Sequence, residues 1–175
     1  PPDIRRNSTS NSRKDTERTM MYEWFECKIK YEKTMENGQV KKVTEPYLVD
    51  AINFTEAEKR IIEEMTPFMT GEFQVSDIKR ARFAELFETP GDEADKWFKC
   101  KLTFVLLHEK SGKEKRTSQN ILVQASDLRG AVRRLDEGMK GTMSDYVISS
   151  VTETPIMDVY HYQESVPEHL KKAEN

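Results

Sequence analysis

The sequence predicts an α+β fold made by tandem duplication of one ββαβ unit, with a mostly antiparallel sheet and two helices packed on one face. Three observations indicate this fold. The hexapeptide EWFECK, which begins at Glu23, recurs as KWFKCK from Lys96. Apolar and polar residues alternate along both copies, as in strands with one buried face. A stretch with apolar residues at helical spacing follows in each half, so strands and helices are interleaved twice along the chain.

The match between the two halves extends far beyond the hexapeptide. At an offset of 73 positions Trp24 matches Trp97, and Cys27 matches Cys100. After a one-residue insertion the offset is 74, and the matching pairs are Gly38/Gly112, Leu48/Leu122, Ala57/Ala131 and Met65/Met139. The offset then returns to 73, with the pairs Phe73/Tyr146, Ile78/Val151, Glu85/Asp158 and Phe87/Tyr160. A register kept this far along both halves indicates duplication rather than coincidence.

A β-hairpin opens each half. The inner face of its first strand is expected to carry Phe25, Cys27, Ile29 and Tyr31, and in the second half Phe98, Cys100, Leu102, Phe104 and Leu106. The turns ENGQ and KSGK contain Asn37-Gly38 and Ser111-Gly112, residue pairs that tolerate positive φ. The returning strands end in the related pentapeptides YLVDA and ILVQA.

A helix and a third strand complete each half. Thr55 and Glu58 have the spacing of a capping box, and Ser126 is the expected N-cap of the second helix. The buried helix faces are expected to be Ala57, Ile61 and Met65, and Leu128, Ala131, Val132, Leu135 and Met139. The expected helix ends are Pro67 in the first half, and Gly138 and Gly141 in the second. Strand patterns resume at Phe73 and Tyr146 with room for a short fourth strand, and Pro155 favours an edge or a bend.

Four segments are predicted along the 175 residues: a disordered N-terminal extension (1–20), two repeats (21–92 and 93–162) and a polar C-terminal tail (163–175). The extension is rich in Ser, Thr, Asn and Arg, a composition that buries too little apolar surface to order itself. Met20 and Met21 stand just before the first strand, so we expect the native start at one of them. The alternative is a genuine basic arm.

Composition narrows the class of protein. The chain has a formal net charge of −3, and this acidic balance argues mildly against a dominant phosphate-binding surface. No apolar run approaches the roughly 18 residues of a membrane span, and no signal peptide pattern is present. The two cysteines provide no disulfide framework. We therefore expect a cytoplasmic protein that is either a monomeric pseudo-dimer or a homodimer.

Metal and cofactor chemistry has little support in the residue pattern. Cys27 and Cys100 hold matching inward positions, where free cysteine packs as a small apolar side chain. Neither a CxxC pair nor a nearby histidine pair supplies the other ligands of a zinc site. Glycine-rich phosphate loops and the HExxH motif are also missing from the sequence. We expect no metal and no cofactor.

Catalysis is likewise not expected. His108, His161 and His169 lie near a hairpin turn or in the C-terminal segment, and suggest no triad. Glu85 and Asp158 are equivalent in the duplication and would be the pair for acid–base chemistry. Carboxylates on strands this polar are more often solvated, so the expectation is that the protein is not an enzyme.

The outer faces of the first strands carry the candidate ligand-binding residues. If Phe and Cys point inward, the alternation turns outward Trp24, Lys28, Lys30, Trp97, Lys99 and Lys101, and the third strand of the first half adds Arg80 and Arg82. Aromatic rings among lysines favour single-stranded nucleic acid, because bases stack on the rings while cations meet phosphates. Two alternatives remain open. The tryptophans pack between the two halves, or the same surface binds a protein, for which exposed Trp is favoured.

Two long stretches, WFECKIKYEKTMENGQVKKVTEPYLVDAINFTEAEKRIIEEM and SVTETPIMDVY, are similar to the uncharacterised domain-of-unknown-function family 4494 of Bacteroidetes and their phages. The resemblance covers the chain from about Trp24 to Tyr160 and implies no activity, cofactor or catalytic residue. Occurrence in bacteria and phages implies a small accessory or regulatory protein more than a metabolic enzyme. We expect a non-enzymatic binding module for single-stranded nucleic acid or for a protein partner, with an enzyme using paired carboxylates as the third candidate.

Overall fold

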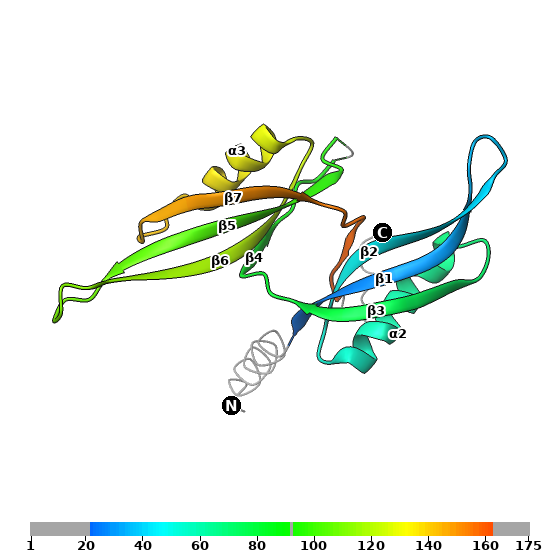
Figure 1. Ribbon diagram of the computed structural model, residues 1–175, viewed down its shortest axis with the longest axis horizontal. Helices are drawn as coiled ribbons and strands as arrows, with labels where there is room; N and C mark the ends of the chain where they lie inside the picture. Colours follow the sequence, from blue (N-terminus) through cyan, green and yellow to red (C-terminus); the bar gives the residue numbers. More distant parts are fainter. Residues whose placement is uncertain (1–21, 92, 163–175) are drawn as a thin grey trace, which may run out of the picture.

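A computed structural model describes residues 22–91 and 93–162 of the chain. Within these residues the chain forms two four-stranded sheets, each with one helix (Figure 1). The predicted extension (1–20) and tail (163–175) lie outside the described residues. Among the residues that are described, none of the helices has the length and apolar character that a membrane crossing requires.

The first sheet takes its three long strands from the first half of the chain. The central strand β1 (Glu23–Thr34) pairs antiparallel with β2 (Val40–Ala51) and with β3 (Phe73–Ala81). The helix α2 (Phe54–Met65) and the 3₁₀ turn η1 (Thr66–Phe68) connect β2 to β3.

The second sheet repeats this arrangement with the second half of the chain. The central strand β5 (Lys96–Leu107) pairs antiparallel with β6 (Glu114–Ala125) and with β7 (Tyr146–Thr154), and α3 (Leu128–Gly138) connects β6 to β7. Both central strands also pair irregularly with the third strand at matching points, between Lys28 and Ile29 and between Lys101 and Leu102. The two repeats therefore share even the position of a β-bulge.

The fourth strand of each repeat joins the sheet of the other repeat. β4 (Glu85–Phe87) follows β3 but pairs parallel with β6, so that Leu86 lies opposite Leu122. β8 (Val159–Tyr160) follows β7 but pairs parallel with β2, so that Val159 lies opposite Leu48. The strand orders are β3-β1-β2-β8 and β4-β6-β5-β7.

This exchange of strands is reciprocal down to single hydrogen bonds. The backbone N–H of Ala84 donates to the carbonyl of Asn120 over 2.8 Å, and the equivalent N–H of Met157 donates to Pro46 over 2.9 Å. The segments that carry the chain across, 82–84 and 155–158, thus lie in equivalent positions between the sheets. The two repeats are related by an approximate twofold arrangement, and each completes the other.

The predicted α+β class and the mostly antiparallel pairing are confirmed. The strands divide between two sheets, and each helix covers one face of its own sheet. In the view of Figure 1, α3 lies on the upper side of its sheet and α2 on the lower side of the other. The two helices therefore do not share one face of a single sheet, as the sequence suggested, and only the fourth strand of each repeat crosses to the neighbouring sheet.

The helices begin one or two residues away from the predicted caps. Asn53 is the N-cap of α2, and its side-chain oxygen accepts the N–H of Glu56 over 2.8 Å. Asp127 caps α3 by accepting the N–H of Gly130 over 2.7 Å. The N-caps are therefore Asn53 and Asp127 rather than the predicted Thr55 and Ser126; Asn and Asp are at least as favourable at this position.

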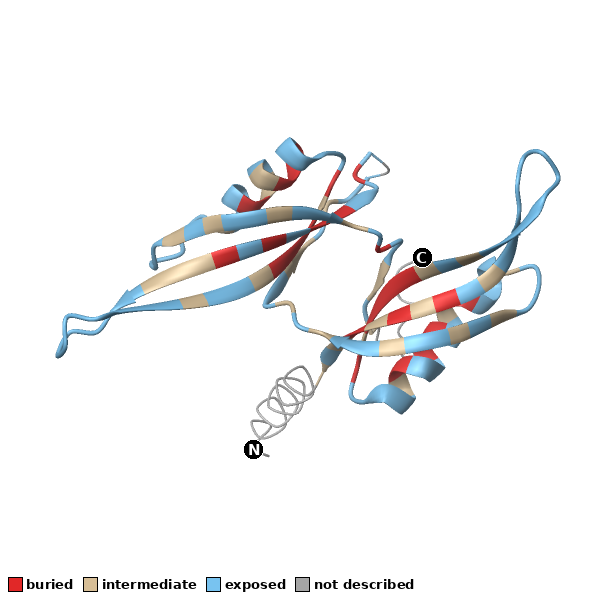
Figure 2. Cartoon of the chain, viewed as in Figure 1, coloured by how far each residue is buried: buried red, intermediate tan, exposed pale blue. Residues whose placement is uncertain are grey.

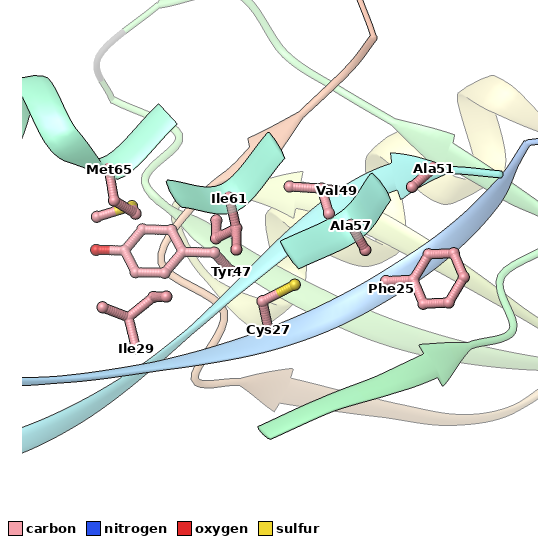
Figure 3. Close-up of a cluster of buried hydrophobic side chains, with 9 residues drawn as sticks. All are labelled: Phe25, Cys27, Ile29, Tyr47, Val49, Ala51, Ala57, Ile61 and Met65. Atoms are coloured by element: carbon pink, nitrogen blue, oxygen red, sulfur yellow. The ribbon is translucent and has the colours of Figure 1, made fainter. Parts of the chain in front are cut away.

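Each repeat has its own core between sheet and helix. In the first repeat Phe25, Cys27 and Ile29 point from β1 toward Ala57, Ile61 and Met65 of α2 (Figure 3). In the second repeat the equivalent Phe98, Cys100 and Leu102 face Ala131 and Leu135. Figure 2 shows buried residues along the central strands and the helices, with further ones where the chain crosses between the sheets. The predicted inward faces are confirmed for these residues, whereas Leu106 at the end of the predicted strand face and Leu128 at the start of the predicted helix face are exposed.

Candidate binding surface on the outer sheet faces

Both tryptophans lie where the two repeats meet. Trp97 is only 2% exposed and packs in a third cluster with Leu48, Leu122 and Ile156. Trp24 is half-buried against the same cluster, and its ring meets the His161 ring edge-on at 5.1 Å between centroids. The expectation that Trp97 offers its ring to a ligand is wrong, because the exchanged segments cover the outer face of its sheet at that point. The alternative, packing between the halves, describes both rings.

On the first sheet, acidic side chains lie beside several of the basic residues. Lys79 of β3 binds Glu26 of β1 at 3.4 Å, and Arg80 binds Glu23 at 3.3 Å. The half-buried Lys28 stands directly opposite Asp77 in the strand register. Lys30 and Arg82 are exposed. Arg80, predicted on this face, instead lies on the helix side of the sheet, opposite Phe25 and over the Phe54 ring. The outer face itself carries Glu26 and Asp77 beside its lysines, a mixture of charges rather than a basic strip.

On the second sheet the equivalent positions have lost their acids. Lys99 stands where the first repeat has Glu26, and it lies between Leu122 and Thr152. Lys101 lies between Asn120 and Ser150, whereas its counterpart Lys28 faces Asp77. Both lysines are exposed, and within the described residues neither forms an ion pair. The outer face of the second sheet is thus a strip of two free ammonium groups among neutral hydroxyl and amide side chains.

The predicted site residues consequently divide into three groups. Trp24 and Trp97 belong to the junction between the repeats, while Lys28, Lys30, Arg80 and Arg82 belong to the first sheet or the segment after it. Lys99 and Lys101 form a separate strip on the second sheet. The duplication predicts that all these residues lie on equivalent outer strand faces. Because two separate sheets carry them, the residues do not form one continuous surface.

The two cysteines are core residues in separate clusters. Both are fully buried as free thiols. Burial raises the pKa of Cys27 to about 12, helped by the negative charges of Glu26 and Asp77, and burial alone raises the pKa of Cys100 to about 11. A thiol with so high a pKa remains protonated near neutral pH and is a poor nucleophile or metal ligand.

The equivalent carboxylates Glu85 and Asp158 belong to different sheets. Glu85 begins β4, beside Ile121 of the second sheet. Asp158 precedes β8, where its Oδ1 accepts the N–H of Val159 and its carbonyl accepts the N–H of Leu48. No hydrogen bond joins the two carboxylates in the described part of the chain. Glu85 is exposed, whereas Asp158 is hydrogen-bonded at the start of its exchanged strand.

The histidines do not assemble a metal site in the part of the chain that is described. Nδ1 of His108 lies 3.2 Å from the hydroxyl of Ser111 in the hairpin turn, and His161 pairs with Glu88. His169 lies outside the described residues. Over residues 22–91 and 93–162, no three His, Cys, Asp or Glu side chains gather closely enough to hold a metal ion.

The contact of His161 with Glu88 was not predicted from the sequence, although the signal was present. The same offset of 73 that relates the tryptophans relates these two residues. The offset shows that the two residues are equivalent, but it does not show that the exchange of strands brings them into contact.

A family model described as Domain of unknown function (DUF4494) matches residues 23–162. No curated protein and no solved structure matches the chain.

Proposed function

The chain belongs to the family described as Domain of unknown function (DUF4494), and we propose that it is a non-enzymatic binding protein for single-stranded nucleic acid. The observation that supports this proposal is the strip on the second sheet, where Lys99 and Lys101 have no acid opposite them. Their counterparts in the first repeat are Glu26, which binds Lys79, and Lys28, which faces Asp77. The duplicated unit has therefore become basic on one copy only.

The strip suits an extended phosphodiester chain. Lys99 and Lys101 are two residues apart on one face of a strand, so their side chains leave the sheet about 7 Å apart. Two ammonium groups in a row contact successive phosphates, while Ser150, Thr152 and Asn120 beside them offer hydrogen bonds. Because Trp97 is buried, base stacking contributes little, and we propose weak sequence preference with strong salt dependence. The free thiols suit a reducing compartment, which we propose is the cytoplasm.

Fluorescence anisotropy with a labelled oligonucleotide tests this function. Removing both lysines in Lys99→Ser/Lys101→Ser should weaken binding and lower the slope of log K against log salt by about 0.7 for each lysine. The control is Lys28→Ser/Lys30→Ser, which removes the two outward lysines of β1 in the acid-rich repeat and should have a much smaller effect. Absence of binding at low salt, or equal losses in both variants, would contradict the proposal.

A protein partner is a second candidate because apolar side chains are exposed at the far end of the second repeat. Met143 is 99% exposed, Leu107 is 68% exposed, and Leu106 and Val147 are also exposed. Leu106 lines a groove that also contains Thr142 and Ser144, the two neighbours of Met143 in the sequence. The test is co-purification of one defined protein from nuclease-treated native lysate. Loss of that protein in Leu107→Ser/Met143→Ser, with oligonucleotide binding unchanged, would favour this candidate over the first.

A further inference from the structure

Each repeat has a groove between its helix and the strand received from the other repeat. In the first repeat, α2 provides Glu56, Lys59, Arg60, Glu63 and Glu64, and the chain from Val159 to Tyr162 provides the other wall. In the second repeat, α3 provides Arg133, Arg134, Glu137 and Gly138, and the chain from Leu86 to Thr89 provides the other wall. Apart from Glu56, the residues of the two sets are equivalent at the offsets of the duplication. Differences between them therefore show what each groove has gained or lost.

In the first groove the arginine is fully engaged. The guanidinium of Arg60 donates to both the carboxylate and the backbone carbonyl of Asp50. It also lies over the Tyr162 ring, 5.4 Å from the centroid, and Tyr22 stacks on that ring at 5.1 Å. With Glu64 also on the wall, this groove is internally neutralised.

In the second groove the equivalent arginine, Arg134, forms no ion pair with a described carboxylate. Asp50 is replaced by Gln124. Gln124 accepts the N–H of Thr89, as Asp50 accepts the N–H of Tyr162, but its amide donates to the carbonyl of Ala94 and does not bind the arginine. Tyr162 is replaced by Thr89, and Glu64 by Gly138. The second groove therefore lacks both the aromatic ring that stacks on the arginine and one carboxylate. Neither Arg133 nor Arg134 forms an ion pair or a hydrogen bond with another described residue.

We propose that this second groove, of about 750 Å³, binds a phosphate monoester attached to a flat ring, the chemistry of a nucleoside monophosphate. Two guanidinium groups provide the planar donors that phosphate oxygens accept best. Leu86 and Phe87 provide an apolar wall for a ring, and Glu137 provides an acceptor for ring amino groups. Glu88, the other carboxylate of the groove, is already engaged by His161.

This site is separate from the lysine strip of the proposed function. The groove lies on the side of the second sheet that α3 covers, whereas Lys99 and Lys101 project from the opposite side. A small phosphate monoester and a nucleic acid strand therefore have different contact residues. Failure of one proposal leaves the other standing.

The test is an NMR titration of the full chain with nucleoside monophosphates, the matching nucleosides and inorganic phosphate. The expected amide shifts lie at residues 86–89 and 133–138, with the monophosphate binding more tightly than either other probe. Arg134→Gln should weaken binding by about tenfold or more, because a charge-assisted hydrogen bond is worth at least that factor. Lys59→Gln, in the corresponding groove of the first repeat, should leave affinity unchanged, and so should Lys99→Ser/Lys101→Ser.

Gln124→Asp offers a second variant that restores the acid of the first groove. The new carboxylate should engage Arg134, as Asp50 engages Arg60, and should weaken monophosphate binding while the fold is retained. Three results would overturn the proposal: no shifts at millimolar monophosphate, equal binding of nucleoside or inorganic phosphate, or shifts confined to other surfaces. Retained affinity in both Arg134→Gln and Gln124→Asp would overturn it as well.

Discussion

Nε2 of His161 lies against the Glu88 carboxylate, and these two residues hold equivalent positions in the two repeats. A residue meets its own equivalent only near the axis that relates two copies. The contact therefore marks where the approximate twofold axis passes, just after the two exchanged strands. In a symmetric dimer of one repeat, the same position would face itself. The duplicated chain places complementary groups there.

The Glu88–His161 contact is expected to add little stability. Its side chains are 42% and 47% exposed, and exposed ion pairs typically contribute about 0.2–1 kcal/mol. A double-mutant cycle with Glu88→Ala and His161→Ala, measured by urea unfolding near pH 6, should give a coupling free energy in that range. A coupling several times larger would show that the pair holds the repeats together by itself.

Gly138 is expected to be required because an exchanged side chain lies on it. A Cβ at this position would stand 2.6 Å from Cε2 of Phe87, a residue of β4. Gly138→Ala should lower the free energy of unfolding by about 1–3 kcal/mol, the usual cost of overpacking. Gly71→Ala is the control, because nothing lies within 4 Å of its added Cβ. If the smaller side chain in Phe87→Leu fails to relieve the Gly138→Ala defect, the contact is not its cause.

Trp97 is expected to be a stability residue. Truncation in Trp97→Ala removes a ring that is 2% exposed, and should cost about 3–5 kcal/mol of unfolding free energy. Trp24→Ala should cost less because that ring is only half-buried. Chemical denaturation followed by circular dichroism measures both. A Trp97→Ala variant with unchanged stability would mean that the junction between the repeats is not packed as described.

The thiols are expected to be inert in the folded protein and to make stability fall at alkaline pH. With pKa values near 12 for Cys27 and 11 for Cys100, both hold their protons more tightly folded than unfolded, where the ordinary value is 9.0. Their contribution is complete below pH 9 and is lost as pH rises toward the folded values. Ellman's reagent near pH 8 should react only after unfolding. Rapid reaction of native protein would contradict the burial of both thiols.

Local patterns predicted much of each repeat. Alternation along β1 and β5 identified the residues that face the helices, and Asn37-Gly38 identified a hairpin turn in which Gly38 has a φ of 81°. The inward strand residues and the hairpin turn depend on residues close together in the sequence, so the sequence pattern is sufficient to predict them.

The parts that sequence reasoning missed depend on contacts between the repeats. Alternation places Trp97 on the outer side of its strand but does not say what covers that side. The fourth strands have three and two residues, which is too short to show an alternation pattern. Because the two repeats are alike, the sequence also does not indicate which of the two sheets each fourth strand joins. The loss of acids beside Lys99 and Arg134 becomes visible only when strand register and groove walls are known.

The central claim is that each repeat completes the sheet of the other, and nuclear Overhauser effects across the fourth strands test it most directly. The account predicts contacts of Leu86 with Leu122 and of Val159 with Leu48, since these residues lie opposite one another. Contacts of Leu86 with Leu48 and of Val159 with Leu122 would instead show that each fourth strand stays in its own repeat, and would contradict the exchange.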